Sequence, residues 1–292
     1  MKFNVSKKVR SHNFGFIPSG KFLIDLYGKL IGHQNLVKRL QATHIINALN
    51  TSSTDTVLDF GCGAGYITVE LAKIAKMAYG IDVNPYVSSI IIPDSLQGKL
   101  NYILAKGEQL PFEESYFDKI LASEILPMVD DPDVFIKEIR RVIKHNGKLI
   151  VLNGAGHPAI KTAYQKNTHL FRFVRMLYGA TLPGSYEEYC NILQKSFGTR
   201  RNSFMQKEDI HSLLIDNGFV VESTQYTPGY WAGAFVSWSQ FLLYLRTGKT
   251  LSQSSFFLKF LVLSILSLID TRRYPGGILC VASLSKNEPT IK

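Results

Sequence analysis

The sequence predicts an α/β fold built on a doubly wound, mostly parallel sheet, and two observations support this prediction. Residues 54–153 alternate short apolar segments with helical ones, an order typical of parallel strands joined by right-handed crossovers. The segment 56–66 also reads as a buried strand that runs directly into a turn with three glycines and then into a helix. Such a turn lets a ligand approach bare backbone, and we expect it to present unpaired amide groups. The fold class thus predicts a ligand site at the carboxyl ends of the strands.

The spacing of the glycines narrows the class of ligand. They stand at Gly61, Gly63 and Gly65, whereas the dinucleotide fingerprint has two residues between its second and third glycines. Asp59, just before the turn, would repel a pyrophosphate but suits a ligand that carries an ammonium group. A second apolar strand ends on Asp82, where a carboxylate can accept hydrogen bonds from both ribose hydroxyls. These residues together predict a nucleoside cofactor with a cationic group.

Five segments resemble, in sequence order, the motifs of the class I S-adenosylmethionine-dependent methyltransferases. They are Val57–Gly65 (motif I), Ile81-Asp82, Gly107–Phe112, Phe117–Glu124 and the helix, turn and strand of Ile136–Val151. The Leu110-Pro111-Phe112 sequence is similar to that of the quinone- and small-molecule-type members. The resemblance covers roughly residues 51–153 and implies a Rossmann-like sheet with an antiparallel last strand. It also implies S-adenosyl-L-methionine as the cofactor.

The resemblance further implies a set of cofactor-binding residues: Asp59, Gly61, Cys62, Gly63, Asp82, Val83, Gly107, Glu108 and Ser123, with Glu124 beside them. The glycines and the backbone of Cys62 would form the floor under the amino-acid half of the cofactor. Asp59 would hold that half, either by binding the ammonium or by orienting the turn. Asp82 would bind the ribose, Val83, Gly107 and Glu108 would flank the adenine, and Ser123 would line the cleft.

Two positions depart from the family pattern. Lys106 stands where many members have an acid that accepts from the adenine amino group, and lysine has no acceptor. Met128 stands near a position where many members have a histidine, so no catalytic base is assigned. His33, His157 and Tyr164 remain open as bases for a hydroxyl acceptor. No compact Asp, Asn and His cluster suggests a metal.

The predicted core is flanked by segments of different character. The domains expected are a helical lid segment at 1–50, the cofactor-binding core at 51–154, a helical acceptor-side insertion at 155–204, and the rest of the core at 205–292 with an apolar helical insertion at about 228–275. In the lid segment, helices are expected near Phe22–Leu30 and Leu36–Leu49. Leu36, Leu40, Thr43, Ile46 and Leu49 would pack the second helix on the sheet, and Phe14, Phe16 and Tyr27 are lid candidates.

The run Phe256–Ile269 is apolar but shorter than the ~20 residues that span a bilayer. Three settings fit it: burial in an enlarged domain, a homo-oligomer contact, or a helix half-sunk in a membrane interface. Trp231 and Trp238 nearby, with basic residues at both ends, suit the interface. The sequence leaves these settings open.

Charge and cysteine usage limit the function classes. The net charge of +10 divides into +7 for residues 1–50, −4 for 51–154 and +7 for 155–292, and basic flanks suit an acidic acceptor, a phospholipid surface or nucleic acid. Nucleic-acid methylation is less favoured because Ser123–Leu126 lacks an Asn/Asp-Pro-Pro-Tyr-like motif. Three distant cysteines and the absence of a signal peptide predict a cytoplasmic enzyme, with membrane association left open.

The function that these observations favour is methyl transfer, by in-line displacement, to a small hydrophobic or lipid-like acceptor. A nucleic-acid methyltransferase and a non-catalytic protein that retains the cofactor fold are the alternatives.

Overall fold

The computed structural model describes residues 36–154, 205–227 and 277–285, together with residues 26, 172, 185, 187, 188, 191 and 192. Some of the predictions fall outside these residues. They concern the first helix of the lid segment apart from Leu26, the lid aromatics, the three candidate bases, and the insertion with its 256–269 helix.

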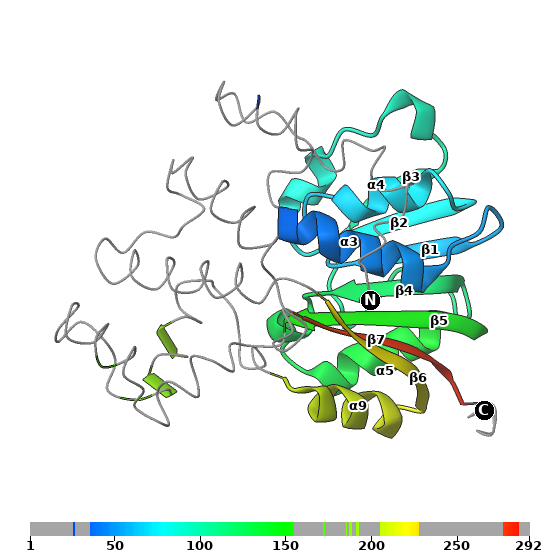
Figure 1. Ribbon diagram of the computed structural model, residues 1–292. Coiled ribbons are helices and arrows are strands. Elements are labelled where there is room, and N and C mark those ends of the chain that lie inside the picture. Colours follow the sequence, from blue (N-terminus) through cyan, green and yellow to red (C-terminus); the bar gives the residue numbers. More distant parts are fainter. Residues whose placement is uncertain are drawn as a thin grey trace.

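The described strands form one seven-stranded sheet in the order β3-β2-β1-β4-β5-β7-β6 (Figure 1). The strands are β1 (Thr56–Phe60), β2 (Met77–Asp82), β3 (Leu100–Leu104), β4 (Phe117–Ser123), β5 (Ile143–Gly154), β6 (Phe219–Thr227) and β7 (Gly277–Leu284). β1 to β5 pair in parallel, and β7 lies antiparallel between β5 and β6. The predicted fold class, with its antiparallel last strand, is confirmed.

Helices cover both faces of the sheet. Successive side chains of a strand point to opposite faces, and apolar side chains are buried on both, so each face has its own hydrophobic core. The described helices are α3 (Leu36–Leu49), α4 (Tyr66–Ala72), α5 (Pro132–Val142) and α9 (Lys207–Asp216), with 3-10 turns η1 (Pro85–Ser89), η2 (Asp94–Leu96) and η3 (Leu126–Met128). α3 and α4 pack on the face of Val57, whereas α5 and α9 pack on the face of Leu58 and Phe60. Figure 1 shows the resulting three layers.

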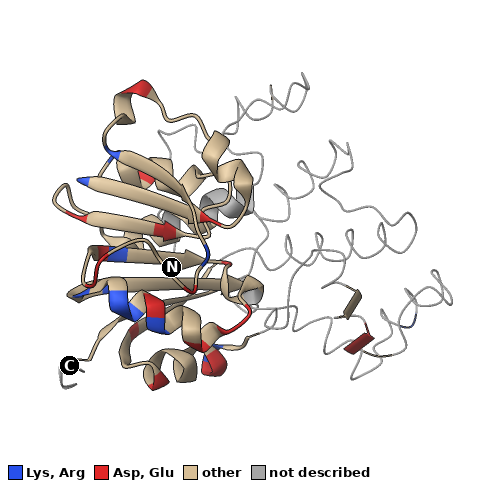
Figure 2. Cartoon of the chain, turned by 180° about the vertical axis from the view of Figure 1, so that it is seen from behind, with Lys and Arg blue, Asp and Glu red and all other residues tan. Residues whose placement is uncertain are grey.

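The sequence explains why α5 begins and ends where it does. Asp131 caps it by accepting from the amides of Asp133 and Val134 at 2.9 and 3.2 Å, and Pro132 occupies the first turn. The helix is rich in Lys and Arg, with acidic residues among them (Figure 2). The turn implied between the helix and the strand of Ile136–Val151 is instead an irregular part of β5, which begins at Ile143 directly after α5.

The predicted helix Leu36–Leu49 is confirmed in its bounds, but the predicted packing face is partly wrong. Leu49 is buried as expected, whereas Ile46 is only half-buried and Ala42 and Ile45 are fully buried. The helix carries apolar side chains on two adjacent stripes, so its period alone did not decide which stripe would meet the sheet. α9 begins at Lys207 and is followed by Asn217 and Gly218, and Gly218 has the left-handed φ of +81° that often follows a helix end.

Candidate cofactor site

The register of the parallel strands brings the predicted site residues to one edge of the sheet. Phe60 is level with Ile81 on one side and with Ala122 on the other. The glycine turn after β1, Asp82 at the end of β2 and Ser123 at the end of β4 therefore meet at the carboxyl edge. β1 and β4 are neighbours without being consecutive in sequence, and this reversal of strand order is where open α/β sheets bind ligands.

Three backbone amides of the glycine turn are already hydrogen-bonded within the fold. The amides of Gly61 and Cys62 donate to the Ile81 carbonyl at 2.8 and 2.9 Å, and that of Gly65 donates to the Cys62 carbonyl at 2.9 Å. The expectation of unpaired amides is thus wrong at these positions, because the turn folds back on the end of β2. What the turn offers is bare backbone: a Cβ on Gly63, at φ +53°, would meet nothing within 4 Å.

Asp82 is held beside the turn by two backbone amides. Its Oδ2 atom accepts from the Gly63 amide at 2.8 Å, and its Oδ1 atom accepts from the Asn84 amide at 2.8 Å. A carboxylate has about four lone-pair sites, so two acceptor positions remain after these bonds. The side chain is only half-buried and is therefore open to a ligand at the strand tip.

Asp59 lies on the other side of the turn and faces inward. It is 3% exposed, and its Oδ2 atom accepts from the Thr68 hydroxyl at 2.6 Å. Burial raises the pKa of Asp59 to about 6, the hydrogen bonds from Thr68 oppose this rise, and the charge of Asp82 adds to it. Of its two expected roles, this geometry suits orientation of the turn and of α4 better than direct contact with an ammonium group.

Tyr102 of β3 is a site residue that the sequence did not indicate. Its hydroxyl donates to the Gly65 carbonyl at 3.1 Å, and a Cβ on Gly65 would overlap the tyrosine ring. The ring reaches the turn because Gly80 is level with Tyr102 on the neighbouring strand and has no side chain in the way. The pairing of Gly80 with Tyr102 on neighbouring strands is the feature that could have indicated this contact.

Cys62 shows no sign of reactivity. The residue is half-buried, and burial, together with the charges of Asp59 and Asp82, raises the pKa of its thiol well above the usual value. The thiol therefore stays protonated, as expected for a small side chain in a turn.

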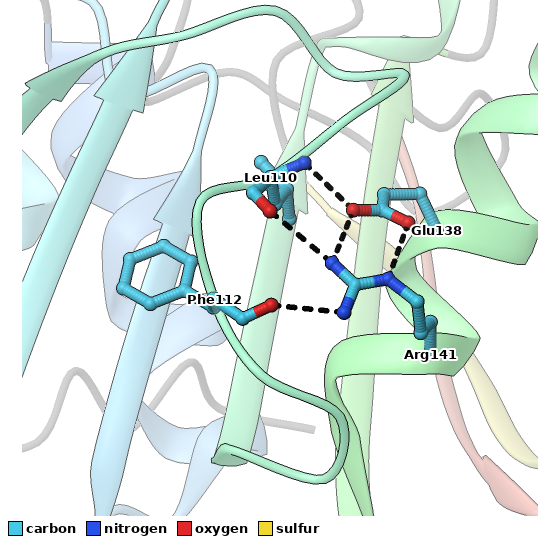
Figure 3. A network of polar contacts seen from close by, with 4 residues as sticks. All are labelled: Leu110, Phe112, Glu138 and Arg141. Atoms are coloured by element: carbon cyan, nitrogen blue, oxygen red, sulfur yellow. Dashed lines mark hydrogen bonds and ion pairs between the residues drawn. The ribbon is translucent and has the colours of Figure 1, made fainter.

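The loop Gly107–Phe112, which the family resemblance places beside the adenine, is hydrogen-bonded to the Glu138–Arg141 ion pair of α5 (Figure 3). Arg141 donates to both oxygens of Glu138, at 2.8 Å through Nε and 2.6 Å through Nη2. It also donates to the carbonyls of Phe112 at 2.8 Å and Leu110 at 3.2 Å, while Glu138 accepts from the Leu110 amide at 2.6 Å. Burial alone would raise the pKa of Glu138, but its hydrogen bonds and the Arg141 charge outweigh burial and lower it.

The other predicted cofactor-binding residues also lie at this edge of the sheet, but they differ in solvent exposure. Gly107 is buried, and a Cβ there would press on Phe60 and Phe135, whereas Glu108 is exposed and Val83 is 63% exposed. Ser123 is half-buried at the end of β4. The structure thus brings the nine residues to one edge, and their contacts with a cofactor stay predictions.

Known proteins resemble this chain over the same region. A family model described as "Methyltransferase domain" matches residues 58–151. The demethylmenaquinone methyltransferase of Oceanobacillus iheyensis is 28% identical over 188 residues, which are 62% of this chain and 76% of that protein. The sterol 4-C-methyltransferase strm-1 of Caenorhabditis elegans is 30% identical over 145 residues, 48% of this chain and 40% of that one.

Solved structures share the fold at low sequence identity. Geranyl diphosphate C-methyltransferase from Streptomyces coelicolor A3(2) superposes with a TM-score of 0.53 at 15% identity, covering 84% of this chain and 77% of that one. The [4+2]-cyclase SpnF gives 0.54 at 18% identity, covering 84% and 80%. Because the second is named a cyclase, likeness of fold alone does not decide the reaction.

Residues 58–151 thus form a methyltransferase domain, and the comparisons support a class I S-adenosylmethionine-dependent methyltransferase that uses S-adenosylmethionine as its cofactor. Within the described ranges, no helix combines the length and apolar character needed to cross a bilayer. The same ranges hold no group of three or more His, Cys, Asp or Glu side chains placed to bind a metal ion.

Proposed function

We propose that the protein transfers a methyl group to a hydrophobic small molecule of the quinone or sterol kind. The support is the chemistry in the names of its relatives, which are methyltransferases of demethylmenaquinone and of a sterol. Exposed apolar side chains near the carboxyl edge also suit such an acceptor: Leu104 ends β3, Met128 follows β4, and they are 49% and 44% exposed.

The observation that carries the cofactor assignment is the placement of Asp82. Two amides orient its carboxylate at the tip of β2, beside bare backbone at Gly63, and leave acceptor capacity for ribose hydroxyls. We assign the ribose to Asp82, the amino-acid half to the turn of Gly61, Cys62 and Gly63, and the adenine to Val83, Gly107 and Glu108. Asp59 would support the turn through Thr68, and Ser123 would line the cleft.

The chain's contribution to the reaction is positioning. The turn of Gly61, Cys62 and Gly63, together with Asp82, would hold the cofactor, which would supply a methyl group activated by its sulfonium. The acceptor's electron pair would form the bond to the methyl carbon as the carbon–sulfur bond breaks, and the acceptor would lose a proton to solvent. In-line displacement demands alignment of three atoms, and rigid placement of the reactants can provide much of the acceleration. We assign that rigidity to three sets of hydrogen bonds. They hold the glycine turn to Ile81, Asp82 to the amides of Gly63 and Asn84, and the Gly107–Phe112 loop to Glu138 and Arg141.

Titration of the protein with S-adenosylmethionine, by calorimetry, tests the site. Asp82→Ala removes the acceptor for two ribose hydroxyls, a loss of about 3 kcal/mol or roughly a hundredfold in Kd. Asp94→Ala is the matched control, because Asp94 is an exposed carboxylate in η2, between β2 and β3. Equal affinities of the two variants would remove Asp82 from the cofactor site.

Methyl-labelled cofactor tests the acceptor. The protein is incubated with a bacterial total-lipid extract that has been reduced with dithionite, and labelled lipid is identified by mass spectrometry. Labelled quinone or sterol is the expected product. A parallel incubation replaces the lipid extract by RNA or DNA, and labelling confined to the nucleic acid would favour the nucleic-acid alternative. Binding of the cofactor without any labelled product would favour a non-catalytic protein.

The net charge of +10 suits an enzyme that meets such acceptors at an anionic membrane surface, and we include that contact in the proposal. Co-sedimentation with phosphatidylglycerol vesicles should be strong at low salt and weak at high salt, because surface attraction is screened. Equal sedimentation with neutral phosphatidylcholine vesicles would exclude the electrostatic contact.

A further inference from the structure

A buried polar side chain at the carboxyl edge of the sheet has no hydrogen-bond partner. Asn153, the next-to-last residue of β5, is 0% exposed, and neither its Oδ1 nor its Nδ2 atom is bonded. A buried amide with donor and acceptor both unpaired is rare, because each group has given up its bonds to water. Folds tolerate such local conflicts chiefly at functional sites, where a ligand can supply the missing bonds.

The position of Asn153 points to the acceptor rather than to the nucleoside. Leu152 is level with Ser123 at the end of β4, so Asn153 lies level with Glu124, one residue beyond that strand. The nucleoside contacts assigned above belong to the ends of β1 and β2 and to the loop after β3. Asn153 lies on the other side of β4 from them, next to β7.

The neighbour of Asn153 provides a second, independent observation. Glu124 has φ +58°, a left-handed backbone conformation that residues other than glycine rarely adopt. Its amide donates to the Leu152 carbonyl at 2.7 Å, and its carboxylate accepts from the Gly154 amide at 3.1 Å. Strained backbone of this kind collects at ligand sites. Hydrogen bonds from and to Glu124 thus join the ends of β4 and β5 beside Asn153, whose side-chain amide has no hydrogen-bond partner.

We propose that Asn153 binds the polar group of the methyl acceptor, an inference that rests on the proposed function. Nδ2 donates to an oxygen of the acceptor, and Oδ1 accepts from a hydroxyl of it. The apolar remainder of the acceptor needs no such partner. This chemistry selects a hydrophobic molecule that carries at least one hydroxyl, as a reduced quinone or a sterol does, over a hydrocarbon without oxygen.

Asn153→Leu tests the proposal, because leucine has a similar volume and no polar atoms. The native chain and the variant are compared in three ways: urea unfolding, titration with S-adenosylmethionine, and labelling of the dithionite-reduced lipid extract at several extract concentrations. Thr227→Val is the matched control. Thr227 lies at the end of β6, level with Gly277, and its buried hydroxyl is also unpartnered.

The expected result separates binding from stability. Asn153→Leu should unfold at the same urea concentration as the native chain or a higher one, because it removes two unsatisfied groups. Its affinity for the cofactor should stay within about twofold, while labelling at low extract concentration falls about tenfold or more and partly recovers at high concentration. Thr227→Val should keep native labelling.

Three outcomes would overturn the assignment. A clearly lower unfolding midpoint would make Asn153 a structural residue with bonds in the fold. Native labelling by Asn153→Leu would leave it without a role in acceptor binding. Equal losses in Asn153→Leu and Thr227→Val would indicate a general disturbance of this edge. If the native chain itself labels no lipid, the proposed function fails, a result distinct from all three.

Discussion

The buried Asp59–Thr68 pair predicts an unusual dependence of stability on pH. Asp59 is 3% exposed, accepts from Thr68 at 2.6 Å, and has a pKa raised from 3.8 to about 6 by burial. Between these two values the folded chain binds a proton that the unfolded chain has lost. The stabilising effect of this proton is therefore fully present below pH 3.8 and is lost as the pH rises through about 6.

The magnitude follows from the shift. Two pKa units correspond to about 3 kcal/mol, so relative to an Asp59→Asn variant the native chain should lose about this much stability between pH 4 and pH 8. Thr68→Val removes a donor to the carboxylate. We expect this to cost about 2 kcal/mol at pH 8, where Asp59 is ionised, and about 1 kcal/mol at pH 4, where it is neutral.

Urea unfolding followed by circular dichroism at several pH values measures these differences. The Asp59→Asn background is the control, because there the cost of Thr68→Val should no longer change with pH. Subtracting the unfolding free energy of the Asp59→Asn variant at each pH removes the contribution of the other carboxylates. Among them, Asp118 and Glu222 have lowered pKa values, so their contribution to stability increases as the pH rises. A native chain and an Asp59→Asn variant with parallel pH profiles would refute the reasoning.

Other predictions concern the turn and the loop. Gly65→Ala should destabilise by about 2 kcal/mol or more, since its Cβ would overlap Tyr102 at φ +75°, whereas Gly63→Ala should cost only about 1 kcal/mol in urea unfolding, because space is open there. Equal costs would contradict the contact with Tyr102. Arg141→Lys should weaken cofactor affinity severalfold in calorimetry, because an ammonium cannot bond the loop carbonyls and Glu138 together. Arg140→Lys on the same helix should not, since Arg140 donates to the Asn217 carbonyl, which follows α9, at 3.4 Å.

Local sequence patterns were enough to place most of the elements. The apolar strand before Gly61, the acid that ends β2 at Asp82 and the Asn217-Gly218 end of α9 each depend on neighbours in sequence, and all three are observed. The resemblance to a known family added the antiparallel position of β7, which no local pattern contains. The fold and the class of reaction are therefore both legible in the sequence.

The hydrogen-bond and packing partners of individual residues could not be predicted from the sequence, because these partners lie far apart in the chain. Bonding of the turn amides to the Ile81 carbonyl, and the reach of Tyr102 to Gly65, depend on the register of β1, β2 and β3. A helical period likewise shows that α3 is helical without showing whether Ile45 or Ile46 meets the sheet.

The sequence by itself determined that this chain has a glycine turn and a carboxylate at neighbouring strand ends, since both follow from short-range patterns. The tertiary structure alone decided that the turn closes on its own amides, that Asp59 is buried against Thr68, and that Asn153 is enclosed without a partner. The physical reason is that hydrogen bonding and burial are properties of packed neighbours. Only strand register and helix placement determine which residues those neighbours are.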